Sequence, residues 1–152
     1  MPTTLDDLTA IRESVGKTLG QSEWHLVDQD TINRFADATG DHQWIHVDVE
    51  RAKTESPFGT TIAHGYLTLS MMPVFIGETV RFGKVSMVLN YGCNKVRFPS
   101  PVKVNSRLRA TTVLTSVEEV AGGIQIVLTV TVEAAGETKP VCVAETVSRV
   151  YA

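Results

Sequence analysis

The chain has 152 residues, of which 43% are hydrophobic and 20% are charged, and its net charge is −3. This size and composition predict one globular domain covering residues 1–152. The weak charge and the lack of any basic run argue against nucleic acid or a membrane surface as a partner. Cys93 and Cys142 have no CxxC spacing, which fits a reduced, cytoplasmic compartment.

The chain to about residue 80 has a mostly helical pattern. Its opening stretch, MPTTLDDLTAIRESVGKTLG, has no apolar core, so we expect neither a secretory signal nor a transit peptide. Asp28 can cap a helix in which Ile32, Phe35 and Ala36 recur at helical spacing. Gly40 suits the end of that helix. The next segment, from Thr39 to Val47, is predicted to be a loop.

A second helix is predicted from about Ala63 to Thr79. It is apolar on most faces, so it needs protein around it on all sides. The apolar run AHGYLTLSMMPVFIG is about five residues too short to cross a bilayer, and it includes His64 and Pro73. The pattern therefore predicts a buried core helix.

The part of the chain after about Val85 has the pattern of long strands. RLRATTVLTSVEEV, GIQIVLTVTVEA and PVCVAETVSRVY are rich in Val, Thr and Ile and alternate with period two. Gly122-Gly123 and Ala135-Gly136-Glu137 are predicted to be the turns between them. Helices followed by antiparallel strands predict an α+β domain in which a curved sheet wraps one long helix.

The segment TGDHQWIHVD, Thr39 to Asp48, gathers two carboxylates and two imidazoles in a short loop. Taken alone, Asp41 beside glycine is typical of a turn and His46 of a structural histidine. His42 and His46 have HxxxH spacing, but a zinc protease motif needs glutamate directly after the first histidine. Gln43 stands at that position, and we predict no metal.

Three blocks of the chain, in the family's order, resemble the MaoC-like (R)-specific enoyl-CoA hydratases. The first block contains Gly40-Asp41, Ile45-His46 and Ala52; the second is FGTTIAHGYLTLSMM; the third is NKVRFPSPVKVNSRLRA. Within the family, GDHQWIHVD resembles the nodulation-protein-N-like branch. The chain departs from the family at Gln43-Trp44, where Asn-Pro is usual, and so lacks the fixed φ angle of proline there.

The resemblance implies a hot-dog fold, in which a curved antiparallel sheet wraps a long central helix, and a homodimer. It implies an acyl-CoA or acyl-carrier-protein thioester as the substrate, with no cofactor. Asp41 and His46 are the implied catalytic residues, which hold one water between them. The main-chain N–H of Gly65 is the implied oxyanion donor. Implied substrate-binding residues are Ile62, Ala63, His64, Asn90, Tyr91, Gly92, Arg97, Phe98 and Pro99.

The implied activity is addition of water to trans-2-enoyl-CoA to give (R)-3-hydroxyacyl-CoA, or the reverse dehydration. Which of Asp41 and His46 is the base stays open, as does the choice for His64 between lining the substrate tunnel and bracing the helix. A hot-dog thioesterase and a non-catalytic acyl-thioester-binding module are the alternatives. Hot-dog thioesterases usually place a carboxylate on the central helix, and this chain has none between Ala63 and Gly77.

Overall fold

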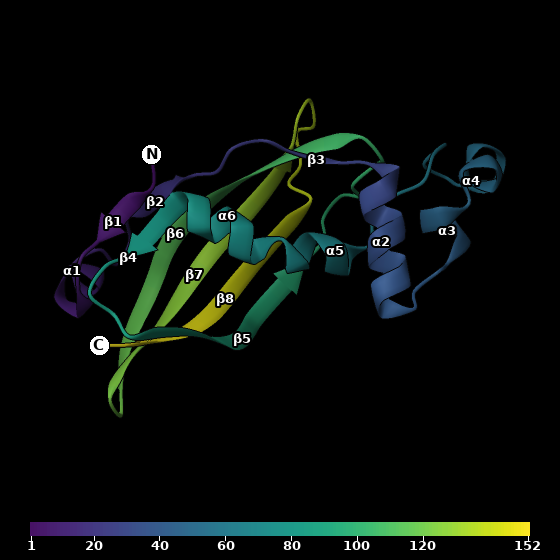
Figure 1. The fold of residues 1–152 in the computed structure, drawn as a ribbon. Coiled ribbons are helices and arrows are strands. Elements are labelled where there is room, and N and C mark those ends of the chain that lie inside the picture. Colours follow the sequence, from purple (N-terminus) through teal and green to yellow (C-terminus); the bar gives the residue numbers. More distant parts are fainter.

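In the computed structural model, which describes residues 1–152, a curved antiparallel sheet folds around two consecutive helices (Figure 1). The strand order of the sheet is β2-β6-β7-β8-β5, and β3 also pairs with β6. The α+β hot-dog arrangement expected from the sequence is confirmed. The strands of the sheet are β2 Thr18–Gln21, β3 His25–Val27, β5 Met87–Arg97, β6 Ser106–Val120, β7 Gly123–Ala134 and β8 Cys142–Tyr151.

The long hairpin of β6 and β7 forms the middle of the sheet. Val120 pairs with Gly123 at its closed end, and Gly122 has φ of 82°, a left-handed conformation that glycine adopts without strain. The predicted turn at Gly122-Gly123 is therefore confirmed. Along β7, alternate side chains are buried against the helices, as the period-two pattern requires. They are Ile124, Ile126, Leu128, Val130 and Val132.

The central helix is divided in two, where the sequence predicted one continuous helix from about Ala63 to Thr79. Helix α5 covers Gly65–Ser70 and helix α6 covers Met72–Thr79. Pro73 stands near the start of α6 and has no N–H to donate to a preceding carbonyl, so the helical ladder is interrupted around Met71. Both helices cross the concave face of the sheet (Figure 1). Phe75 of α6 is fully buried between the layers.

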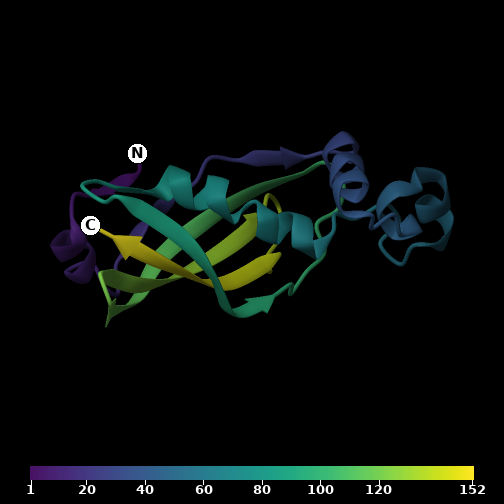
Figure 2. The same cartoon turned by 60° about the horizontal axis from the view of Figure 1, so that its bottom comes forward.

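Three further helices lie beyond one end of the sheet, beside the start of α5 (Figure 2). The predicted first helix is confirmed as α2, Gln29–Thr39, which Asp28 caps by accepting a hydrogen bond from the Thr31 N–H. The predicted loop from Thr39 to Val47 is wrong at its second half, because residues Trp44–Val47 form the short helix α3. Helix α4, Val49–Glu55, follows directly, and its N-cap Asp48 accepts from the Arg51 N–H.

The opposite end of the molecule is closed by a small parallel strand pair that the sequence patterns did not predict. Strand β1, Thr3–Leu5, pairs with β4, Val80–Phe82, and helix α1, Leu8–Arg12, follows β1 (Figure 1). Strands this short carry too few residues to display a period. None of the helices has the length and apolar character needed to cross a bilayer.

Candidate active site

The turn after α2 brings Asp41 to the start of α5. Gly40 ends α2 with φ of 84° and so reverses the chain, and Asp41 is the next residue. Its side chain is exposed, and its carboxylate accepts one long hydrogen bond, of 3.3 Å, from the main-chain N–H of Gln43. The carboxylate therefore keeps most of its hydrogen-bonding capacity for another partner.

His46, on α3, is buried and has a defined tautomer. Its Nδ1 lies 2.7 Å from the main-chain oxygen of Ile62, and a carbonyl can only accept, so Nδ1 carries the proton. Nε2 is then an unprotonated nitrogen with a lone pair. Burial lowers the pKa of His46, the nearby His64 lowers it further, and the Ile62 hydrogen bond and the Asp41 charge oppose the shift. His46 is thus neutral at pH 7, with Nε2 able to accept a proton.

His64, the residue before α5, is buried against both of these groups. Its Nε2 lies 2.9 Å from the main-chain oxygen of Asp41. Its ring stacks on that of His46, with 3.9 Å between centroids and 24° between planes. Phe35 of α2 packs against His64 at a centroid distance of 4.9 Å. The sequence motifs indicated each histidine but not this stacking.

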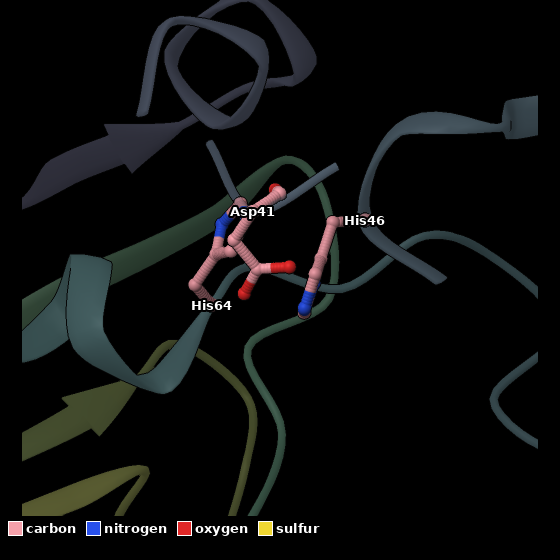
Figure 3. A group of neighbouring side chains, drawn as sticks. All are labelled: Asp41, His46 and His64. Atoms are coloured by element: carbon pink, nitrogen blue, oxygen red, sulfur yellow. The ribbon is translucent and has the colours of Figure 1, made fainter. Parts of the chain in front are cut away.

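Asp41, His46 and His64 form a compact cluster (Figure 3). One nitrogen or carboxylate oxygen from each lies within 4.8 Å of the others, and the Asp41 carboxylate and the His46 ring point towards one another. A metal would need lone pairs that converge on one point. In each histidine one nitrogen already faces a main-chain oxygen, so each ring has one nitrogen left for a metal or for proton transfer. His42 lies outside the cluster and pairs with Asp37 instead.

A chain of hydrogen bonds fastens α3 to the segment that leads into α5. The main-chain N–H of Ile62 donates to the oxygen of Ile45 at 3.0 Å. The Gln29 side-chain amide donates to the main-chain oxygen of His46 at 2.8 Å, and its carbonyl accepts from the buried Thr61 hydroxyl at 2.6 Å. The position of His46 therefore depends on Gln29 and Thr61. Gln29 lies outside the three blocks, and Thr61 lies in the second block but was not predicted to be a site residue.

A cavity of about 310 Å³ opens beside the cluster and includes His46 and Gly65. The main-chain N–H of Gly65 makes no hydrogen bond within the chain, as expected at the first residue of a helix. A β-carbon on Gly65 would lie 2.9 Å from the ring of Phe98, so this close approach requires glycine. The cavity is lined by His46, Phe58, Ile62, Ala63, Gly65, Thr68, Phe98, Pro99, Ser100, Pro101, Val102 and Val141.

The predicted substrate-binding residues are divided among several places. Four of them line the cavity beside His46: Ile62, Ala63, Phe98 and Pro99. Asn90 and Gly92 instead line a separate cavity of about 670 Å³ between β5 and the two central helices. Tyr91 faces outward under the guanidinium of Arg149, Arg97 is exposed, and His64 lines neither cavity.

Several lining residues were not singled out from the sequence. Phe58 opens the block FGTTIAHGYLTLSMM and Thr68 lies within it, so membership of that block was the available signal. Val102 and Val141 come from distant segments outside the strands: the Val102 carbonyl accepts from the Ala63 N–H, and the Val141 N–H donates to the Val132 carbonyl. Nothing local in the sequence indicates that they share a cavity.

Residues 10–137 match the model of the MaoC like domain family. The chain belongs to the MaoC-like dehydratase family. Membership places it among the hydro-lyases. The arrangement of α5 and α6 inside the sheet is thus the MaoC-like form of the hot-dog fold.

Two MaoC-like relatives are similar over most of the chain. 3-Hydroxyacyl-thioester dehydratase Z of Mycobacterium tuberculosis is 48% identical over 150 residues, covering 98% of this chain and 99% of that protein. Nodulation protein N of Rhizobium leguminosarum bv. viciae is 48% identical over 136 residues, covering 88% of this chain and 84% of that protein. The resemblance to the nodulation-protein-N-like branch is therefore confirmed.

A solved structure has the same hot-dog fold. The (R)-hydratase from A. caviae involved in PHA biosynthesis superimposes with a TM-score of 0.72 at 23% identity. The match covers 88% of this chain and 94% of that one.

Proposed function

We propose that this MaoC-like protein interconverts trans-2-enoyl thioesters and (R)-3-hydroxyacyl thioesters by adding or removing water. One observation carries the proposal: a ring nitrogen of His46 and a carboxylate oxygen of Asp41 lie within 4.8 Å of each other, and His46 lines a cavity that also includes Gly65. The name of the M. tuberculosis relative, a 3-hydroxyacyl-thioester dehydratase, supports the same chemistry in the direction of water loss.

In the hydration direction, Nε2 of His46 takes a proton from water while the water oxygen forms a bond to C3 of the enoyl group. The π electrons of the C2–C3 double bond move towards the thioester and give an enolate. The Gly65 N–H donates a hydrogen bond to the enolate oxygen. The imidazolium of His46 then returns its proton to C2, so one water has been added and the enzyme is restored. Dehydration follows the same steps in reverse.

The two catalytic groups take different roles in this proposal. The Nδ1–H of His46 is held by Ile62, so proton transfer is left to Nε2. Burial lowers the pKa of His46, which keeps Nε2 unprotonated at neutral pH. The Asp41 carboxylate accepts a hydrogen bond from the attacking water and stabilises the imidazolium once it forms. We therefore assign the base to His46 and the orienting charge to Asp41.

Stereochemistry and turnover together test the proposal. Trans-2-enoyl-CoA substrates of graded chain length, and the matching acyl-carrier-protein thioesters, are mixed with the protein, and loss of the conjugated thioester absorbance is followed. Chiral chromatography of the product is expected to give the (R)-3-hydroxyacyl thioester. The same imidazole takes a proton from the water that attacks C3 and delivers a proton to C2. A reaction in D₂O is therefore expected to place the hydroxyl on C3 and the deuterium on C2 from the same face of the double bond. An (S) product, or no turnover of any substrate by folded protein, contradicts the assignment.

The thioesterase alternative has less support in the site. Helix α5 carries no acidic residue, and the single one on α6, Glu78, is paired with His25 at 2.9 Å. No free carboxylate on the central helices is thus available to activate water against the thioester carbonyl. Release of free thiol from saturated acyl-CoA, measured with a thiol reagent, is expected to stay at the rate without enzyme.

We also propose that two copies pair along β5. This strand lies at the edge of the sheet and pairs only with β8, so one row of its main-chain groups is open. Apolar side chains of β5 are exposed in the single chain, namely Met87, Val88, Leu89 and Tyr91. Light scattering after size-exclusion chromatography is expected to give twice the chain mass for the wild type. Val88→Lys, which puts a charge on this edge, is expected to move the protein towards monomer.

A further inference from the structure

The side chain of His64 contacts both proposed catalytic residues. It is 3% exposed and lines neither cavity, so substrate reaches His46 without touching it. Its Nε2 is 2.9 Å from the main-chain oxygen of Asp41, and its ring covers one face of the His46 ring at 3.9 Å. These contacts therefore favour a role in holding the catalytic pair in place over a role in binding the acyl thioester.

The hydrogen bond from His64 defines its tautomer. The Asp41 carbonyl can only accept, so Nε2 of His64 carries the proton and Nδ1 is a bare acceptor. That Nδ1 is buried and has no hydrogen-bond partner. Leaving a buried acceptor unpaired destabilises the folded state, because the atom has lost its hydrogen bond to water. An apolar side chain would fill the same space without this cost, so packing alone does not account for an imidazole here.

We propose that His64 is a positioning residue that sets the separation and relative orientation of the Asp41 carboxylate and Nε2 of His46. This inference rests on the proposed hydration and dehydration activity. The hydrogen bond fixes the main chain at Asp41, which Gly40 and the exposed loop would otherwise leave free to shift. The stacked ring fixes the plane of His46, and Phe35 of α2 packs against His64 and limits its own movement.

The surroundings of His64 make the pH profile informative. The titratable groups that face it are Asp41, from the loop after α2, and His46, from α3. The side chain from α2, Phe35, is apolar. After burial, closeness to His64 is a further cause of the lowered pKa of His46. Loss of the imidazole at position 64 therefore acts on His46 in a way that loss of packing alone does not.

Two variants separate the two contacts. His64→Gln keeps an N–H that can reach the Asp41 carbonyl but removes the stacked ring. His64→Phe keeps a ring on His46 but removes the donor. We expect each to lower kcat about 10²-fold with KM changed by less than about threefold, as for small misplacement of reacting groups. We also expect the acid limb of the kcat/KM profile to move to higher pH in both variants.

His25→Gln is the matched control. It also removes an imidazole hydrogen bond and a ring contact, those to Glu78 and Phe75, but His25 lines neither cavity. We expect its kcat and acid limb to equal those of the wild type, whatever its melting temperature. If the His64 variants lower only the melting temperature, and the folded enzyme keeps its kcat and acid limb, His64 is a structural brace and the proposal is overturned.

Nuclear magnetic resonance of protein labelled with ¹⁵N-histidine tests the geometry without turnover. At neutral pH, His64 is expected to show a protonated Nε2 and an unprotonated Nδ1, and the titration of His46 is expected to shift upward in both variants. A protonated Nδ1 on His64, or an unchanged His46 titration, overturns the positioning role. A wild type that passes these measurements but converts no enoyl thioester would instead refute the proposed function.

Discussion

The main-chain oxygen of Ile62 accepts a hydrogen bond from Nδ1 of His46 at 2.7 Å, and this contact leaves Nε2 as the reactive nitrogen. Because burial lowers the pKa of His46 below 6.5, the base form persists on the acid side of that value. We expect the acid limb of kcat/KM for hydration to be centred below pH 6.5, at the lowered pKa of His46. An acid limb centred above pH 6.5 would contradict His46 as the base.

The lowered pKa of His46 also makes the stability of the fold depend on pH. The folded protein binds the His46 proton less tightly than the unfolded chain, so the stabilisation from a neutral His46 is complete above about pH 6.5. It is lost as the pH falls through the folded-state pKa, because unfolding then takes up a proton. Urea denaturation at a series of pH values is expected to show this decline. His46→Asn is expected to remove the part of the decline that belongs to His46.

His46→Asn also separates the position of the side chain from its chemistry. The asparagine amide can take the place of Nδ1–H and donate to the Ile62 carbonyl, but it offers no base where Nε2 lay. We expect kcat/KM to fall about 10²–10⁴-fold, the usual contribution of a general base. Circular dichroism is expected to show a wild-type fold. Retention of more than a tenth of the wild-type rate would remove His46 from the mechanism.

Asp41→Asn is expected to lower kcat/KM by about 10²–10⁴-fold, because the amide is neutral and cannot stabilise the imidazolium of His46. Its matched control is Asp37→Asn, which removes a nearby exposed carboxylate that pairs with His42 outside the cluster. The control is expected to turn over enoyl thioester at the wild-type rate. Equal losses in both variants would indicate a general effect of charge on substrate binding.

Sequence patterns predicted more of the fold than of the candidate site. The β6–β7 hairpin was predictable because Gly122-Gly123 and the period-two alternation are local signals. The closeness of Asp41 and His46 was predictable because they are five positions apart and belong to one family motif. Gln29 is outside that motif: it meets Thr61 across 32 positions, so no local pattern reports the contact. The division of the central helix was missed because apolar composition continues unbroken through Pro73.

Gly65→Ala tests how closely Phe98 approaches the proposed oxyanion donor. The added β-carbon would lie 2.9 Å from Cε2 of the Phe98 ring, so the ring or the start of α5 must move. Because Phe98 is 42% exposed, we expect the ring to give way and the protein to fold. Displacement of the donor is expected to lower kcat/KM by up to about 10²-fold.

The double variant Gly65→Ala with Phe98→Leu identifies the cause of that loss. Leucine frees the space that the new methyl group needs, so most of the lost kcat/KM is expected to return if the contact with Phe98 is responsible. The interaction energy comes from the cycle of wild type, both single variants and the double variant. Losses that simply add would mean that alanine acts on the α5 backbone and not through Phe98.

Thr61→Val tests the hydrogen-bond chain beneath His46. Thr61 is fully buried, and its hydroxyl donates to the side-chain carbonyl of Gln29. The side-chain NH₂ of Gln29 donates to the main-chain oxygen of His46. Valine has nearly the same shape but leaves the Gln29 oxygen unpaired. We expect the free energy of unfolding to fall by about 1–3 kcal/mol, measured by urea denaturation.

An exposed threonine supplies the comparison for that measurement. Thr115 forms a hydroxyl pair with Thr129 on the solvent face of the β6–β7 hairpin. Water can replace this contact, so Thr115→Val is expected to change the free energy of unfolding by less than about 0.5 kcal/mol. Similar losses for Thr61→Val and Thr115→Val would show that the chain through Gln29 adds nothing beyond an ordinary surface hydrogen bond.

The two cysteines are expected to differ sharply in their reaction with a thiol reagent. Cys93, on β5, is exposed, whereas Cys142, on β8, is fully buried. Burial raises the pKa of the Cys142 thiol to about 11, and the thiolate is the reactive form. Native protein at pH 8 is therefore expected to release one equivalent of chromophore from an aromatic disulfide reagent, and unfolded protein two.

Cys93→Ser is expected to abolish the native signal, and a residual fast equivalent in that variant would mean that β8 opens at its Cys142 end. If pairing of two copies along β5 covers Cys93, its reaction is expected to quicken in the Val88→Lys variant.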